Sequence, residues 1–232
     1  MSGYKILLLG GTGLVGSEVL KVLPLFKKIE KVFVWARIES PAHSDSPIEI
    51  QTVTWDSFSS GKVQIPEGID AVVCCLGTTI AKAGSQEKFR EVDYEYPLLA
   101  GRKAKEAGVP AFLIVTAMGA NSGSFVFYNR VKGDIENALI DLKFPYLGIF
   151  RPSLLVGDRK ETRIGEKLGE AIATIIPFSL VGMRKYKPIY AQFVAISLLK
   201  SLTAGLEKTK ETTTPQLEII ESDQMLDLGK GL

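Results

Sequence analysis

The chain has 232 residues and a formal net charge of +2, with 46% hydrophobic and 23% charged residues. This composition is ordinary for a globular protein, and a charge so near zero does not favour binding to nucleic acid or to an anionic membrane. The length suffices for one large domain or for a domain with a modest lobe.

Short apolar runs alternate with helix-length segments through the first two thirds of the chain. The predicted strands cover 4–10, 31–37, 48–53, 69–77, 111–117 and 146–150. The predicted helices cover 13–23, about 87–107 and 128–142. Continuous apolar strands separated by helices indicate a parallel sheet that is covered on both faces. Right-handed crossovers then give an α/β, doubly wound Rossmann-type fold.

The last third of the chain is less regular. We expect helices near 163–175 and 189–203, and a strand at 217–221. The chain is therefore interpreted as a single NAD(P)-binding Rossmann-type domain over 1–232, with a small substrate-side lobe mainly from 151–232. The apolar segment 168–183 is most simply the core of this lobe, and an apolar substrate wall or a subunit contact is the alternative.

The few cysteines and the single histidine indicate the cellular compartment and bear on metal binding. Cys74 and Cys75 are the only cysteines, and neighbours on a strand point to opposite faces, so we expect buried thiols in a reducing compartment. The apolar run 6–9 is too short for the core of a signal peptide, and no stretch approaches the roughly 20 residues of a membrane span. A soluble cytoplasmic protein is expected. The single histidine, His43, has no partner cluster, so no metal site is expected.

The first strand and first helix are joined by the glycine turn GGTGLVG, residues 10–16. Its glycines fit the G-x-G-x-x-G pattern in the strand–turn–helix context that dinucleotide binding requires. Glycine lets the backbone approach a pyrophosphate closely, and the helix N-terminus offers unpaired N–H groups. The turn predicts nucleotide binding, and a merely structural turn is the alternative.

The end of the second strand bears on the choice of cofactor. An acidic residue there binds the ribose 2′-hydroxyl of NAD, whereas an arginine suits the 2′-phosphate of NADP. This strand ends in Trp35, Ala36 and Arg37, with no acid at its tip. Arg37 therefore favours NADP(H). Glu39 could still bind the ribose, and Arg37 could be a solvated surface residue.

Tyr128 is the only one of seven tyrosines with a lysine four positions later, Lys132. On a helix these two residues share a face. A lysine cation stabilises a nearby phenolate, so Tyr128 could give a proton to a carbonyl oxygen or take one from an alcohol. An ordinary amphipathic helix turn is the alternative, but the pair opens the helix after the fifth strand, downstream of the glycine turn.

The glycine turn and Tyr-x-x-x-Lys together resemble the short-chain dehydrogenase/reductase superfamily. Further blocks resemble its Tat-interacting-protein-type atypical reductases, which bind NADPH. These blocks are CCLGTT (74–79), KAG (82–84), FREVDYEY (89–96), YNRVKGDIE (128–136), FRPSLLVGDRKETRIGE (150–166) and LDLGK (226–230). The similarity runs over nearly the whole chain.

The resemblance implies a role for each matching residue. Tyr128 would be the proton donor or acceptor, Lys132 its partner, and Thr116 the hydroxyl that binds the substrate oxygen. The implied cofactor-binding residues are Gly10, Thr12, Gly13, Leu14, Val15, Gly16, Arg37, Leu76, Gly77, Tyr128, Lys132, Leu155 and Arg163.

The chain departs from the family at the end of the fifth strand. Relatives commonly carry a pair of serines there, whereas this chain has Thr116 followed by Ala117. If the second position is the functional one, Ser122 or Ser124 would need to supply the hydroxyl. Asp56 is a candidate for the adenine-contacting acid after the third strand.

The resulting hypothesis is an NADPH-dependent oxidoreductase acting on a small-molecule carbonyl or alcohol. The first alternative is a non-turnover NADPH-binding regulator or redox sensor, which the alanine at 117 favours. The second is an epimerase or dehydratase of nucleotide sugars, for which the chain is short. We expect no nucleic-acid partner and no membrane span. A homodimer is compatible with the sequence, which leaves the oligomeric state open.

Overall fold

The computed structural model describes residues 3–36, 47–157 and 184–230. Its centre is a parallel seven-stranded sheet in the order β3-β2-β1-β4-β5-β6-β9. The strands are β1 (Tyr4–Leu9), β2 (Ile29–Ala36), β3 (Ile48–Thr52), β4 (Ala71–Cys74), β5 (Ala111–Val115), β6 (Tyr146–Arg151) and β9 (Gln216–Glu221). The strand order reverses between β1 and β4, so the Rossmann-type fold expected from the sequence is confirmed.

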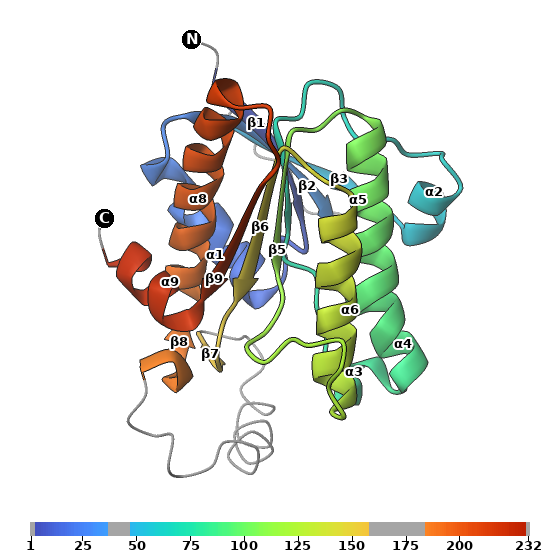
Figure 1. Ribbon diagram of the computed structural model, residues 1–232. Coiled ribbons are helices and arrows are strands. Elements are labelled where there is room, and N and C mark those ends of the chain that lie inside the picture. Colours follow the sequence, from blue (N-terminus) through green and yellow to red (C-terminus); the bar gives the residue numbers. More distant parts are fainter. Residues whose placement is uncertain (1–2, 37–46, 158–183, 231–232) are drawn as a thin grey trace.

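Two layers of helices cover the sheet (Figure 1). One face carries α1 (Leu14–Val22) and α8 (Ala191–Glu211), and the other carries α5 (Tyr96–Glu106) and α6 (Phe127–Asp141). The shorter elements are η1 (Leu23–Leu25), α2 (Trp55–Ser59), α3 (Ile80–Ala83), α4 (Gln86–Arg90), η2 (Glu91–Glu95), η4 (Arg184–Tyr186) and α9 (Ser222–Gly229). A separate small sheet pairs β7 (Leu155–Val156) with β8 (Ile189–Tyr190) in parallel.

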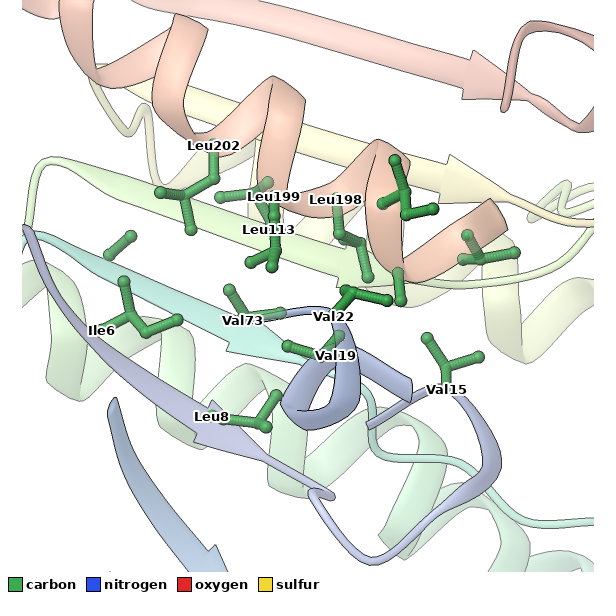
Figure 2. Close-up of a cluster of buried hydrophobic side chains, with 14 of the residues drawn as sticks. Ile6, Leu8, Val15, Val19, Val22, Val73, Leu113, Leu198, Leu199 and Leu202 are labelled. Atoms are coloured by element: carbon green, nitrogen blue, oxygen red, sulfur yellow. The ribbon is translucent and has the colours of Figure 1, made fainter. Parts of the chain in front are cut away.

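A hydrophobic core lies on each face of the sheet. The central strands contribute side chains to both cores, because successive side chains point to opposite faces. Ile6 and Leu8 of β1 join the cluster beneath α1 and α8, whereas Leu7 and Leu9 join the cluster beneath α5 and α6. Figure 2 shows the first cluster, where sheet residues meet apolar side chains from both helices. Its labelled residues are Ile6, Leu8, Val73 and Leu113 from the sheet, Val15, Val19 and Val22 from α1, and Leu198, Leu199 and Leu202 from α8.

The segment predicted as one helix over about 87–107 is instead three consecutive pieces. It runs through α4, the π-helical turn η2 and then α5. The extra residue that a π turn accommodates is often associated with functional sites, and here it carries the buried Asp93. The helix stops as expected, since Gly108 follows α5 with φ +74°.

The predictions for the last third have mixed outcomes. The helix expected near 189–203 is α8, which begins at Ala191 and continues to Glu211, and the strand expected at 217–221 is β9. The predicted helix near 163–175 and the apolar segment 168–183 lie outside the described residues. Among the helices that the structure describes, none is both long and apolar enough to cross a membrane.

Candidate nucleotide and catalytic site

The glycine turn lies between β1 and α1, at the carboxyl end of the sheet. Gly10 has φ +79°, and a Cβ there would lie 2.7 Å from the carbonyl oxygen of Cys75. A Cβ on Gly16 would lie 2.2 Å from the carbonyl oxygen of Gly10. A side chain at Gly10 or Gly16 would therefore clash with the backbone. The glycine turn is packed closely against the end of β4 and the start of α1.

Among the described residues, no side chain caps the backbone N–H groups at the start of α1. The N-cap residue is Gly13, which has no side chain to bond them, and the first turn contains no acidic residue. Thr12 and Gly13 are exposed, whereas Val15 is buried in the core (Figure 2), so Val15 could serve a ligand only through its backbone. Such a helix N-terminus suits an anionic group like a pyrophosphate.

Two further predicted contacts lie near this turn. Leu76 directly follows the Cys75 that packs on Gly10, and it is half-buried against the core. Leu155 lies in β7, and a Cβ on Gly157 just beyond β7 would lie 2.8 Å from a methyl group of Leu14. Arg37 and Arg163, predicted to bind the 2′-phosphate and the nicotinamide end, lie outside the described residues.

Lys132 and Asp93 form a buried ion pair beneath Gly77. Lys132 Nζ lies 2.7 Å from Asp93 Oδ1, and the two side chains are 5% and 0% exposed. The backbone N–H of Thr78 donates to Asp93 Oδ2 at 2.9 Å. A Cβ on Gly77 would lie 3.5 Å from Asp93 Oδ1 and 3.9 Å from Lys132 Nζ. The predicted residues Gly77 and Lys132 are therefore brought together, with Asp93 as their common neighbour.

The Lys132–Asp93 pair places a charged lysine beside Tyr128. Burial by itself would lower the pKa of Lys132, but the Asp93 carboxylate, helped by Tyr128 and Cys74, outweighs burial and raises that pKa above its ordinary value. Burial raises the pKa of Tyr128, and the Lys132 cation opposes the rise. Within the described part of the chain, no group hydrogen-bonds the Tyr128 hydroxyl. Tyr128 is thus a protonated phenol beside a fixed cation at neutral pH.

Thr116 is placed differently from the other predicted catalytic residues. Its side chain is buried, and its hydroxyl donates to Glu136 Oε1 at 2.6 Å. Glu136 is in turn held by Arg151, whose Nε lies 3.1 Å from the same Oε1 atom. The proton that a substrate carbonyl would need from Thr116 is therefore engaged by Glu136.

The alternative hydroxyls have partners of their own. Ser122 Oγ accepts a hydrogen bond from Asn137 Nδ2 at 3.1 Å, and Ser124 Oγ accepts one from the backbone N–H of Val126 at 3.1 Å. Each serine keeps its own proton to donate, whereas Ala117 has none. Asp56 is exposed in the first turn of α2.

The sequence reasoning did not single out Asp93 and Glu136. A signal was present for each, because Asp93 lies four residues after the buried Phe89 and Glu136 lies four residues after Lys132. An acid on the buried face of a helix needs a partner, and Lys132 needs a counter-ion. The Lys132–Asp93 and Thr116–Glu136 pairs were not predicted because the two partners of each pair come from different elements.

Cysteine chemistry and metal binding have little support in the described residues. Burial raises the pKa of Cys74 to about 12, so its thiol stays protonated at neutral pH. Cys74 and Cys75 are both free. Across residues 3–36, 47–157 and 184–230, no three His, Cys, Asp or Glu side chains come together as a metal site.

Comparison with known proteins identifies relatives along nearly the whole chain, although no family model matches it. Protein FMP52, mitochondrial, from Meyerozyma guilliermondii is 32% identical over 230 residues, which are 97% of this chain and 95% of that protein. Protein HTATIP2 from Rattus norvegicus is 30% identical over 234 residues, covering 99% and 91%.

Solved structures share the fold at low identity. The UDP-Glc/GlcNAc 4-epimerase of Campylobacter jejuni superposes with a TM-score of 0.66 at 14% identity, over 97% of this chain and 82% of that one. MoeE5 in complex with UDP-glucose and NAD gives a TM-score of 0.62 at 11% identity, over 97% and 80%. At these identities the likeness concerns the fold alone.

The relatives correct one expectation from the sequence and confirm another. The prediction of a cytoplasmic protein is contradicted, because relatives from several yeasts, including Eremothecium gossypii and Debaryomyces hansenii, are named as mitochondrial proteins. The absence of an evident signal peptide was a poor guide, since a signal peptide concerns secretion only. The predicted family is confirmed: the chain belongs to the FMP52 and HTATIP2 family of atypical short-chain dehydrogenases/reductases.

Proposed function

We propose that the protein is an NADP(H)-dependent oxidoreductase that interconverts a small carbonyl compound and its alcohol. The observation that carries the proposal is the buried Lys132–Asp93 pair, 2.7 Å between Nζ and Oδ1, one helical turn from Tyr128. A buried charged pair at the carboxyl end of a Rossmann sheet, beside a titratable phenol, is typical of a catalytic site.

The residues around the glycine turn fit a dinucleotide. Gly10, Gly13 and Gly16 allow the backbone to approach a pyrophosphate, and the open N–H groups of α1 supply hydrogen bonds. Solved neighbours titled as complexes with NAD, such as MoeE5 and the UDP-glucuronic acid 4-epimerase of Bacillus cereus, support a nicotinamide cofactor. The preference for NADP(H) over NAD(H) rests on Arg37 in the sequence. Leu76, Leu155 and Arg163 are proposed contacts on the nicotinamide side.

The chain's own residues supply the proton chemistry. The bound cofactor would supply or accept hydride at the substrate carbon. Tyr128 would donate its proton to the carbonyl oxygen in reduction and accept it from the alcohol in oxidation. Lys132 would remain a cation because the ionised Asp93 carboxylate favours the protonated form of the lysine. This cation would stabilise the Tyr128 phenolate after the proton is transferred. Asp93 thus has a positioning role.

Thr116 gives a reason to consider a second function. Its hydroxyl donates to Glu136, and Ala117 beside it has no hydroxyl, so a donor to the substrate oxygen is weakened. This arrangement favours a protein that binds NADP(H) without turnover, as a regulator or redox sensor. Under either function, the names of the yeast relatives support a mitochondrial location.

The test is NADPH consumption with a panel of aldehydes and ketones, for the wild type and Tyr128→Phe. Loss of the proton donor should reduce turnover by about 10²- to 10⁴-fold while NADPH affinity stays unchanged. The matched control is Tyr4→Phe, which removes a hydroxyl bonded to Glu207 at the start of β1, and it should keep full activity.

Turnover by Tyr128→Phe at the wild-type rate would remove Tyr128 from the mechanism. A wild type that binds NADPH but reduces nothing in the panel would favour the regulator over the oxidoreductase.

A further inference from the structure

Neither residue at the end of β5 offers a free hydroxyl to a substrate. The hydroxyl of Thr116 donates to Glu136 Oε1 at 2.6 Å, and Ala117 has no hydroxyl. A charged acceptor forms a stronger hydrogen bond than a neutral carbonyl does, so the Thr116 proton stays with the buried carboxylate. A hydrogen-bond donor that assists Tyr128 at the substrate oxygen therefore has to come from another part of the site.

The two serines of the loop before α6 are anchored on the far side of that helix. Ser122 Oγ accepts a hydrogen bond from Asn137. Asn137 comes about two and a half helical turns after Tyr128, so it points to the opposite side of α6. The carbonyl of Ser124 accepts a hydrogen bond from Arg130 Nη1 at 2.9 Å. Arg130 comes two residues after Tyr128, and residues at that spacing on a helix do not face each other.

Thr78 follows the end of β4 and is fixed beside the buried ion pair. Its backbone N–H donates to Asp93 Oδ2 at 2.9 Å, and Oδ1 of the same carboxylate lies 2.7 Å from Lys132 Nζ. Because Asp93 is buried, this contact holds the Thr78 backbone in a defined place. The side chain of Thr78 therefore projects from a backbone that is bonded to the same carboxylate as Lys132.

The segment that carries Asp93 also contacts Tyr128. The ring centroid of Phe89, in α4, lies 5.5 Å from that of Tyr128, and Asp93 follows in η2. Gly77 above the ion pair is exposed, and a Cβ there would lie 3.9 Å from Lys132 Nζ. The segment formed by α4 and η2 thus gathers Tyr128, Lys132 and the turn after β4 at a place that a ligand can reach.

The half-buried hydroxyl of Thr78 has a proton to give. Within the described residues, its one hydrogen-bond contact is with the carbonyl of Thr79 at 3.5 Å, beyond the ordinary O–H···O distance of about 2.7–2.8 Å. Thr79 has another task, because its hydroxyl accepts the backbone N–H of Lys82 at 3.2 Å as the N-cap of α3. A hydroxyl rotates toward an incoming acceptor, so Thr78 can turn its proton to a substrate oxygen.

We propose that Thr78 is a catalytic residue whose hydroxyl donates a hydrogen bond to the substrate oxygen, a role that Ala117 cannot fill. This role rests on the oxidoreductase function proposed above. In reduction, Tyr128 transfers its proton to the carbonyl oxygen, whereas Thr78 keeps its own proton and stabilises the negative charge that develops on that oxygen. In oxidation, the same hydrogen bond orients the alcohol oxygen toward Tyr128.

Steady-state kinetics of Thr78→Val and Thr78→Ser test this role, with an aldehyde or ketone that the wild type reduces. Valine has nearly the shape of threonine and keeps the backbone N–H that binds Asp93, so the hydroxyl alone is lost. Thr78→Val should lower kcat about 10²- to 10³-fold with NADPH affinity unchanged. Thr78→Ser keeps the hydroxyl and should retain most of the activity. The matched control Thr214→Val removes an exposed hydroxyl just before β9 and should keep the wild-type rate.

The outcomes separate this role from the oxidoreductase function. Equal kcat values for the wild type and Thr78→Val would overturn the role of Thr78 and leave the oxidoreductase standing. A loss in Thr78→Val that serine at the same position does not restore would also overturn it, because the hydroxyl is then not what matters. A large loss in Thr116→Val with none in Thr78→Val would return the donor role to Thr116. A wild type that reduces no carbonyl compound would overturn the oxidoreductase and the role of Thr78 together.

Discussion

Asp93 is the neighbour that does most to keep Lys132 charged. Its side chain is almost fully buried, and a lone buried ammonium would lose its proton rather than remain in an apolar setting. Asp93 keeps it charged, and the Thr78 N–H holds the second oxygen of that carboxylate. The cation beside Tyr128 is therefore preorganised before any ligand binds.

A double-mutant cycle measures this dependence. Asp93→Asn leaves a buried ammonium without its counter-ion, and Lys132→Met leaves a buried carboxylate, so each should lower the free energy of unfolding by about 3–5 kcal/mol. The double variant should lose much less than the sum, because neither charge is then stranded. Urea unfolding at neutral pH gives the three values.

The surface pair Lys103 and Glu106, 3.5 Å apart and 29% and 67% exposed, is the control for this cycle and should show a coupling of about 0.5 kcal/mol or less. Additive losses at Asp93 and Lys132 would mean that the two groups do not interact in solution.

The pH dependence of stability follows from the same residues. The pKa values of Tyr128 and Lys132 are both raised in the folded protein, so the native state holds these protons more tightly than the unfolded chain does. Their contribution is fully present below the unfolded pKa values, about 10, and is lost as the pH rises through the folded values.

We therefore expect the free energy of unfolding to fall as the pH is raised above about 9, and to fall less steeply in Tyr128→Phe. Urea titrations at a series of alkaline pH values measure both slopes. A stability that rises over this range in the wild type would contradict the assignment.

At the scale of elements, the site is assembled from turns at the carboxyl ends of β1, β4 and β5. The β1–α1 turn packs on the end of β4, and the π-helical turn η2 brings Asp93 to Lys132 of α6. A regular α-helix over the same residues would present a different face after Glu91, so the irregular turn is what aims Asp93 at the lysine.

The glycine turn makes an element-scale prediction. Gly16→Ala places a methyl group 2.2 Å from the Gly10 carbonyl, which must move the turn away from α1. We expect NADPH affinity to fall at least about tenfold, because the N–H groups that face the pyrophosphate are displaced. Fluorescence titration of NADPH measures the change.

Gly123→Ala is the control for this substitution, since its Cβ would lie 3.4 Å from Asn121 Oδ1 and needs no rearrangement of the backbone. Unchanged NADPH binding in Gly16→Ala would show that this turn does not hold the cofactor.

The sequence predicted regular elements better than it predicted contacts between them. The strands of the central sheet and α1, α6 and α8 follow from apolar periodicity and the glycine turn, and the lysine one turn after Tyr128 follows from helical spacing. The short strands β7 and β8 were not predicted. The π-helical turn has no such signal, because one extra residue barely changes the pattern from Phe89 to Tyr96. The Thr116–Glu136 bond and the Lys132–Asp93 pair each join residues that are distant in sequence, so local sequence patterns do not predict them.

At the scale of the whole molecule, the proposed cofactor and proton-transfer groups lie at the carboxyl ends of the central strands. The glycine turn after β1, the end of β4 and the Asp93–Lys132 pair come from separate parts of the chain. The parallel sheet brings them to one edge, which is where Rossmann-type folds bind their ligands.

A titration of NADPH and of NADH against the wild type and Arg37→Ala tests whether the protein binds a nicotinamide dinucleotide and which one. We expect the wild type to bind NADPH tightly and NADH more weakly. Removing one charge-assisted contact of about 1.5–3 kcal/mol should cost Arg37→Ala roughly ten- to a hundredfold in NADPH affinity and leave NADH affinity nearly unchanged. Binding of neither dinucleotide by the wild type would contradict both the oxidoreductase and the regulator, and would leave GGTGLVG as a structural turn only.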